Sequence, residues 1–397
     1  MEDHSLNSSH MNLSLDLQCH HSPPQFQRFL LVAVFGTAVS LIGTVENCTL
    51  FLVWVRRQNR RNSHFLYLIC LAFFDTFISV SYLLLMSASV WMDMFQIKQM
   101  VELWWAYMVP VLATSHATMT SSSYLITAAT FERFLIATRS KWLKKVQKSR
   151  QIITLTVIVL AFVFKGTVIL EIAVYHRFNC TGMTKYYADA SFFLAHHPSY
   201  DKVFRFWVRN LTTIFLPFLL CFYFNVRIVV VLRRQHRSAQ LFRIANTEYK
   251  ANVRAATRML VLVVCTYLAA NLLNVFITAW EFIDMGSLMV NPEFYVYSAD
   301  VVSFLTIAAS SLRLPIYCAC NNEIRLEIYS ALANRCTHAS PSAQQAEERT
   351  KLLNGTPAPT RSRKMQGTEF DRLALALAIG FTPTTANSET RLATSQR

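Results

Sequence analysis

The chain has 397 residues, of which 53% are hydrophobic and only 15% are charged, so it is more apolar than one soluble core of this length requires. Its net charge of +15 would suit nucleic acid only on a solvated basic domain. The basic residues stand instead in short runs between hydrophobic stretches, and we expect no nucleic-acid partner. Composition therefore favours a membrane protein, with membrane lipid as a partner.

Seven segments are long and apolar enough to cross a hydrocarbon core of roughly 30 Å, which takes about 20 helical residues. In chain order we predict them at 29–55, 64–90, 103–138, 151–175, 204–232, 257–284 and 297–320. The predicted fold is an all-α membrane protein, a seven-transmembrane helix bundle that occupies residues 29–320.

Basic residues predict the orientation of the bundle. Runs of Arg and Lys follow the first, third and fifth segments, at 56–61, 141–148 and 233–243. The positive-inside rule places these connections in the cytoplasm, so residues 1–28 become an extracellular N-terminal segment of a multi-pass plasma-membrane protein. Sequons at Asn7 and Asn12 predict glycosylation there. No cleavable signal peptide is evident in this segment.

Two further regions follow the last segment. Residues 322–328 alternate charged and apolar side chains, so we predict a short amphipathic eighth helix on the membrane surface at 321–336. Residues 337–397 are rich in Ser, Thr, Ala, Gln and Pro and predict a disordered cytoplasmic tail that kinases could modify.

Ionisable groups inside predicted spans are informative because they are costly in a membrane. Asn47 lies in the first span, Asp75 ends the stretch LAFFD in the second, and Glu132, Arg133 and Phe134 end the third. Together these residues resemble the pattern of rhodopsin-like (class A) G-protein-coupled receptors. The alternative for Glu132 and Arg133 alone is an interfacial charge pair at a helix end.

The chain resembles more narrowly the invertebrate FMRFamide-like and myosuppressin-like neuropeptide receptors, particularly those of nematodes. The carriers of this resemblance include Glu171, Pro217, Trp280 with Glu281, and the stretch RLPIY that runs from Arg313 to Tyr317. The resemblance implies a receptor for an extracellular amidated peptide that activates a heterotrimeric G protein and binds arrestin through its tail. It assigns coupling and switching to Glu132, Arg133, Phe134, Asp75, Arg313, Tyr317 and Asn271.

Several residues depart from the family pattern. The usual third-helix cysteine is absent, so Cys180 lacks its usual partner and Cys19 is the other cysteine on that side. A Cys19–Cys180 disulfide is therefore expected. Asn271 stands near the place of the usual sixth-helix Trp. Arg313 replaces the Asn or Asp of the seventh helix, and it either pairs with Asp75 or extends to the cytoplasmic headgroups.

Acidic and aromatic residues gather at the predicted extracellular ends, where they suit a cationic, aromatic peptide end. The ligand-binding candidates are Glu171, Glu281, Asp93, Glu102, Asp300, Trp280, His116 and Lys165. The alternative is that the acids are simply solvated and that Trp280 is an ordinary interfacial tryptophan.

Other functional classes find less support in the sequence. The seventh span contains no Lys for a retinal Schiff base, and no matching broken helices suggest a transporter. No HExxH, GxSxG or phosphate-binding loop pattern is present, so we expect no enzyme, no cofactor and no metal site. The remaining alternative is a seven-helix scaffold or trafficking protein with a receptor fold but no G-protein signalling.

Overall fold

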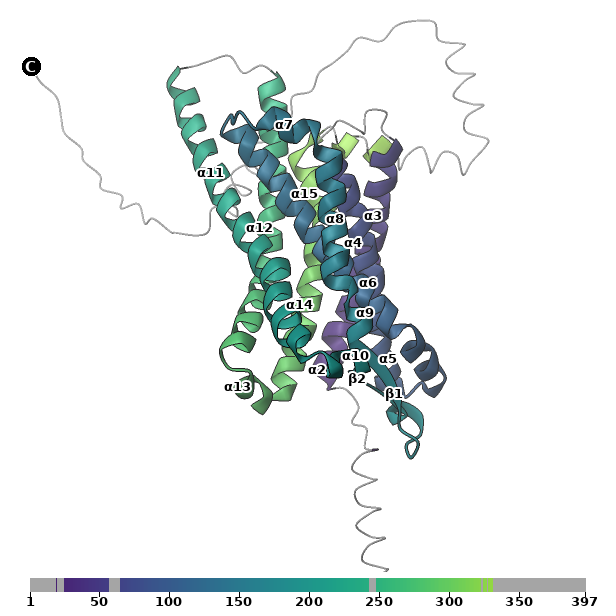
Figure 1. Cartoon of the computed structure of the whole chain (residues 1–397). Coiled ribbons are helices and arrows are strands. Elements are labelled where there is room, and N and C mark those ends of the chain that lie inside the picture. Colours follow the sequence, from purple (N-terminus) through teal and green to yellow (C-terminus); the bar gives the residue numbers. More distant parts are fainter. Residues whose placement is uncertain are drawn as a thin grey trace, which may run out of the picture.

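The computed structural model describes Cys19 and residues 25–56, 65–242, 248–322, 324–326 and 328–330. These residues form a bundle of long, roughly antiparallel helices (Figure 1). The predicted glycosylation sites Asn7 and Asn12 and the predicted tail at 337–397 lie outside the described residues.

The first two long helices each contain a stretch of π-helix, in which the winding is wider than in an α-helix. The first joins α2 (Phe26–Arg28), η1 (Phe29–Gly36) and α3 (Thr37–Arg56). The second joins α4 (Phe65–Tyr82), η2 (Leu83–Ser87) and α5 (Ala88–Phe95). It ends where Gln96 takes a left-handed backbone conformation with φ of 53°.

The third and fourth long helices meet through a short connection. They comprise α6 (Lys98–Ala137), α7 (Leu143–Lys148), α8 (Arg150–Gly166) and α9 (Val168–Glu171). The helix that we predicted at 151–175 ends earlier, because Ile172 adopts an extended conformation with φ of −116° and ψ of 130°.

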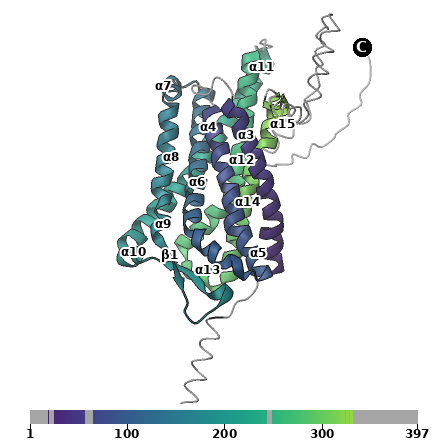
Figure 2. The ribbon, with the colours of Figure 1, turned by 90° about the vertical axis from the view of Figure 1, so that its right-hand side faces the viewer.

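A β-hairpin follows Glu171, and the sequence analysis did not predict it. Strands β1 (Ile172–His176) and β2 (Tyr186–Ala190) pair antiparallel, with Ile172 opposite Ala190. The turn contains η3 (Gly182–Thr184), and α10 (Phe192–His196) comes next. We call this side of the bundle the hairpin end and the side that carries α7 the opposite end (Figures 1 and 2).

The remaining three long helices complete the bundle. The fifth joins η4 (Tyr200–Arg209), η5 (Leu211–Phe215) and α11 (Leu216–Phe242), of which η4 and η5 are π-helical. The sixth is α12 (Glu248–Ile283), followed by α13 (Met285–Val290). The seventh joins α14 (Pro292–Ser311) and α15 (Arg313–Cys320).

Within the described residues, six helices are long and apolar enough to cross a membrane. They are Phe26–Arg56, Leu66–Phe95, Arg150–Glu171, Tyr200–Gln235, Ala255–Ile283 and Pro292–Cys320. Many of their large apolar side chains are exposed, including Leu155 and Val163 on α8 and Leu219 on α11. Exposed apolar surface on such helices indicates a multi-pass membrane protein.

The long helix outside this set is α6, which is more polar and packs against α4, α8 and α11. Its buried face is rich in hydroxyls, and many of them donate to a carbonyl oxygen one turn earlier. Thr120 donates to His116 at 2.9 Å and Ser121 donates to Ala117 at 2.8 Å. This local bonding satisfies these hydroxyls inside the bundle without partners from other helices.

Two apolar clusters hold the helices together. The cluster toward the opposite end includes Leu50, Trp54, Met259 and Tyr317, and the cluster toward the hairpin end includes Val32 and Tyr82. Close approach at the second cluster requires a glycine, because a Cβ on Gly36 would collide with the Tyr82 ring.

Candidate functional site

A charged network lies in the middle of the bundle, where α4, α6 and α15 meet. Arg313 forms an ion pair with Asp75, and both side chains are buried. Ser122 donates to the second Asp75 oxygen at 3.1 Å, and the Arg313 guanidinium donates to Ser122 Oγ at 3.3 Å. The pairing of Arg313 with Asp75 is thus confirmed, and the alternative in which Arg313 extends to the cytoplasmic surface is wrong.

Asn47 and Tyr317 lie near this network, whereas Asn271 of the predicted switch does not join it. Asn47 donates to Ser310 Oγ at 3.3 Å, which joins α3 to α14. Tyr317 is buried, with its ring centroid 5.3 Å from that of Trp54. Asn271 makes only a local bond, from its amide to the carbonyl of Tyr267 at 2.9 Å. The structure therefore brings Asp75, Arg313 and Tyr317 together but leaves Asn271 on its own helix.

The Glu132–Arg133 pair lies at the opposite end of the bundle. Glu132 accepts from Arg150 Nε at 2.8 Å, and the contact is buried. Arg133 is also buried. A small pocket between α4, α6 and α12 reaches both residues and is lined by Tyr67, Leu68, Ala129, Glu132, Arg133, Ala256, Met259 and Leu260. Phe134 faces α11, where its ring stacks on Phe224 at 5.2 Å.

The hairpin end carries the expected disulfide. Cys19 and Cys180 are bonded, with their Cα atoms 5.5 Å apart, so the prediction of this pair is confirmed. The bond ties the segment before the first long helix to the connection between β1 and β2. Farther along the same segment, Arg28 Nε donates to Asp300 at 2.6 Å and Gln25 donates to Glu293 at 3.1 Å. Cys19, Gln25 and Arg28 are thus each fixed to another part of the hairpin end.

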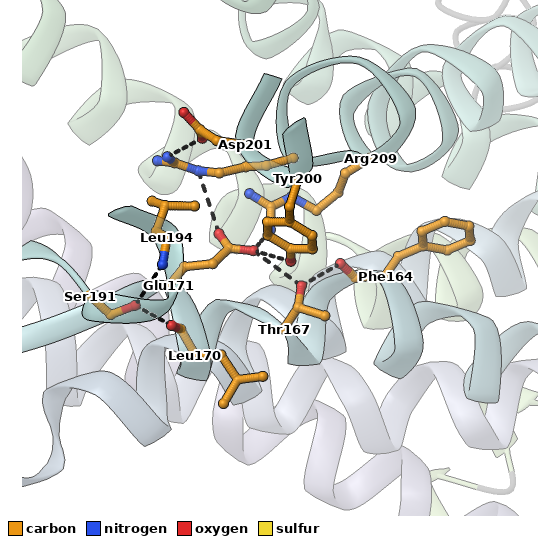
Figure 3. Close-up of polar contacts among 10 residues, drawn as sticks. Phe164, Thr167, Leu170, Glu171, Ser191, Leu194, Tyr200, Asp201 and Arg209 are labelled. Carbon is orange, nitrogen blue, oxygen red and sulfur yellow. Dashed lines mark hydrogen bonds and ion pairs between the residues drawn. The ribbon is translucent and has the colours of Figure 1, made fainter. Parts of the chain in front are cut away.

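Glu171 is the centre of a second charged cluster at the hairpin end (Figure 3). Its carboxylate is buried and forms a short ion pair with Arg209. Tyr200 donates to it at 2.8 Å and Thr167 at 3.2 Å. Arg205 lies 3.5 Å away and also pairs with Asp201 at 2.7 Å. We call these residues, with Lys165, the Glu171 cluster.

The π-helical winding of η4 explains how one helix supplies three of the side chains that contact Glu171. Tyr200 and Arg209 are nine positions apart, which is about two and a half turns of an α-helix and would point them to opposite sides. The wider winding of a π-helix brings both onto one face. Sequence periodicity assumed ordinary α-helix, and for this reason it did not place Arg205 and Arg209 beside Glu171.

The other acidic candidates also have partners within the chain. Asp300 is buried against Arg28, and Glu281 accepts from the Tyr295 hydroxyl at 2.9 Å. Glu102 pairs with Lys185 at 2.5 Å on the surface. Asp93 lies on α5, half-buried. These carboxylates lie at the hairpin end, which is the end where the sequence predicted the ligand-binding residues. The ion pairs with Arg28 and Lys185 leave Asp300 and Glu102 less available to a cationic peptide.

The remaining candidates differ in what they contact. Trp280 donates to Ser287 Oγ at 2.9 Å and has its ring 5.7 Å from Phe276. His116 on α6 and Lys165 on α8 are half-buried, and both interact electrostatically with Arg209. His116 and Lys165 therefore belong with Glu171, whereas Trp280 belongs to the turn that leads into α13.

Sequence analysis predicted Arg313 as the partner of Asp75 but missed the basic partners of the other carboxylates, namely Arg28, Arg150, Lys185, Arg205 and Arg209. Arg209 was the most visible of them, because it stands well inside the span predicted at 204–232, whereas Arg205 stands at its edge, and intramembrane charges need a partner. That signal could have paired it with Glu171. Arg28 and Lys185 lie outside the predicted spans and gave no such signal.

Comparison of the chain with protein-family models and with curated proteins found no match. The geometry of the three polar sites is therefore the basis for assigning a function.

Proposed function

We propose that this chain is a rhodopsin-like G-protein-coupled receptor with seven transmembrane helices. In this proposal α6 is the span that hydropathy alone does not identify, because its buried hydroxyls lower its apolarity. The hairpin end faces outside, which makes the N-terminal segment extracellular and the protein a multi-pass component of the plasma membrane. The Cys19–Cys180 bond supports this orientation, since disulfides persist in oxidising environments.

The observation that carries the proposal is the buried network of Asp75, Ser122 and Arg313. It joins the second, third and seventh long helices at mid-bundle, where charge is tolerated only in a paired or functional role. A network that connects three helices resists their separation in one arrangement. It can also favour another arrangement if the contacts are exchanged, which is what a two-state switch needs.

The proposed G-protein site lies at the opposite end of the bundle. The pocket there lies beside Arg133 and is lined by α12 residues Ala256 and Met259. Outward movement of α12 would enlarge this pocket and expose Arg133 to a partner. A ligand that binds better to the open arrangement would shift the population toward it. Past α15, Ile324 and Ile328 are buried against the same core, as a surface helix that begins at residue 321 would require.

The proposed ligand is an extracellular neuropeptide, and we expect an amidated peptide of the FMRFamide-like or myosuppressin-like type. The support is the sequence resemblance together with the aromatic rings and polar clusters at the hairpin end. Glu281 and Trp280 remain the candidates for contact with its aromatic or basic groups. We further propose arrestin as a partner of the C-terminal tail.

The test is nucleotide exchange on purified heterotrimeric G proteins by the full chain in lipid nanodiscs, screened against a library of amidated neuropeptides. We expect one peptide class to accelerate exchange. Arg133→Ala should abolish this acceleration and leave peptide binding intact, whereas Leu155→Ala on the exposed face of α8 should preserve both. Peptide binding without exchange on any G protein would favour a receptor-fold scaffold or trafficking protein instead.

A further inference from the structure

The Glu171 cluster contains more positive than negative charge. Its basic members are Lys165, Arg205 and Arg209, and its acidic members are Glu171 and Asp201. Asp201 and Arg205 neutralise each other at the exposed rim, where the side chain of each is more than 40% exposed. The inner part therefore has two cations, Lys165 and Arg209, beside the single carboxylate of Glu171.

Lys165 is the unbalanced cation. It lies on the inward face of α8, one turn from Ala161 and from Val168, which are both buried. Arg209 and Glu171 are its electrostatic neighbours. The Glu171 carboxylate is already occupied by Arg209, Tyr200 and Thr167, and Lys165 forms no ion pair with any described residue.

Arg209 in the same cluster also has a hydrogen-bond donor without an acceptor among the described residues. The Arg209 side chain is only 9% exposed, and its Nη1 donates to Glu171. Its Nε is buried and has no hydrogen-bond acceptor among the described residues. A buried N–H without an acceptor destabilises the protein unless a partner arrives. Arg209 and Lys165 thus offer a donor and a positive charge that the protein itself does not satisfy.

Neighbouring side chains fix the position of these two groups. The rings of Phe164 on α8 and Phe204 on η4 stack with centroids 6.1 Å apart, which holds η4 against the end of α8. His116 approaches from α6 and interacts electrostatically with both Lys165 and Arg209. The stacking of α8 on η4 therefore holds the helices that carry Lys165 and Arg209 beside each other at the hairpin end.

We propose that an anionic group of the extracellular ligand, a carboxylate in its simplest form, binds between Lys165 and Arg209. One carboxylate oxygen accepts from Arg209 Nε and the charge neutralises Lys165. This inference rests on the proposed receptor function and extends it, because the expected ligand then carries an acidic group beside its aromatic and amidated ends. Glu171 acts as the positioning residue that orients Arg209.

Because the Lys165 charge is unbalanced, its removal should raise the stability of the free protein, whereas most substitutions of buried residues lower it. Without ligand, Lys165 is a charge with no partner, so Lys165→Met, which keeps the length of the side chain and removes the charge, should stabilise the free protein. We expect a rise in Tm of about 2 °C or more for the full chain in nanodiscs of zwitterionic lipid. Lys202→Met on η4, the π-helix that carries Arg209, is the matched control and should leave Tm unchanged, because Lys202 is exposed. A fall in Tm for Lys165→Met would show that the charge is already neutralised and would overturn the proposal.

The second arm uses a matched pair of probes, N-acetyl-Glu-Phe-amide and N-acetyl-Gln-Phe-amide, at equal ionic strength. The acidic dipeptide should raise the Tm of the wild type and of Lys202→Met but not of Lys165→Met, and the neutral dipeptide should raise none. Equal effects of the two dipeptides would overturn the proposal. So would a lysine-dependent rise with added phosphatidylglycerol alone, because that result assigns the cations to lipid. No G protein is present in either arm, so failure here leaves the nucleotide-exchange test of receptor function untouched.

Discussion

The Asp75–Arg313 network and the Glu171 cluster are both buried ionic sites, yet they differ in charge balance. In the network one guanidinium meets one carboxylate, and Ser122 bonds to both. In the cluster Lys165 is left over, and the Nε of Arg209 has no acceptor among the described residues. A balanced buried pair contributes to holding one arrangement of helices, whereas an unbalanced one is suited to receive a further partner. The predictions below test this distinction and the contacts around it.

The largest effect should come from Asp75→Asn, which leaves Arg313 buried beside a neutral amide. Loss of one partner of a buried pair destabilises a protein by about 3–5 kcal/mol. Chemical unfolding of the purified chain in detergent measures this loss. The double variant Asp75→Asn with Arg313→Met should recover most of the stability, because no charge is then left unpaired. Ser122→Ala, which removes one hydrogen bond only, should cost about 1 kcal/mol.

If Asp75→Asn and the double variant lost the same free energy of unfolding, the unpaired Arg313 charge would not be the cause of the loss. The comparison with Lys165→Met is the sharpest form of this test. Removal of a charge should destabilise the network and stabilise the cluster.

The Cys19–Cys180 disulfide should contribute the next largest effect. The bond joins residues 161 positions apart, and removal of a native disulfide typically costs about 2–4 kcal/mol. Cys19→Ser and Cys180→Ser should lower the free energy of unfolding by similar amounts, and the double variant should be no worse than either, since each alone breaks the same bond. Thermal unfolding with and without reductant provides the measurement. Cys48→Ala, at a free cysteine, is the control, and additive losses at Cys19 and Cys180 would contradict the assignment.

The success of the sequence predictions depended on whether the signal was local. Apolar runs located the central parts of the long helices, because a lipid-facing helix must be apolar along its own length. The polar ends of α11 and α12 extend ten and nine residues past the predicted limits at 232 and 257. The partner of Arg313 was also predictable, since Asp75 is a rare carboxylate inside a span and an unpaired buried charge is costly.

The features that were missed depend on how separate segments pack. The β-hairpin was not predicted, because the apolar run through Ile172 and Val174 suits a helix as well as a strand. The partners of Glu171 were not predicted, because the π-helical winding of η4 changes which of its side chains share a face. The pairing of Arg28 with Asp300 joins residues 272 positions apart, and nothing local in the sequence indicates it.

Substitution of Gly36 by alanine should have a smaller effect on stability, and Gly166 provides a matched control. Gly36→Ala should destabilise the protein by about 1–3 kcal/mol, because its Cβ would collide with the Tyr82 ring and push η1 away from α4. Gly166→Ala should be neutral or stabilise by up to about 1 kcal/mol, since an added Cβ would meet no side chain or neighbouring segment within 4 Å and alanine favours the helix. Thermal unfolding of the two variants side by side compares them directly. The same loss in both would show that backbone flexibility, rather than close approach, explains Gly36.

The smallest effect should come from the surface pair of Glu102 and Lys185. The hydrogen bond from Lys185 lowers the pKa of the Glu102 carboxyl, and the same bond raises the pKa of the Lys185 ammonium. The pair therefore stabilises the folded chain at neutral pH. Its contribution disappears as pH falls through the lowered carboxyl pKa or rises through the raised ammonium pKa. Glu102→Gln should leave Tm at neutral pH nearly unchanged, because both groups are solvated and salt screens them. A marked fall in Tm that persists at high salt would instead place this pair among the contacts that hold the hairpin to α6.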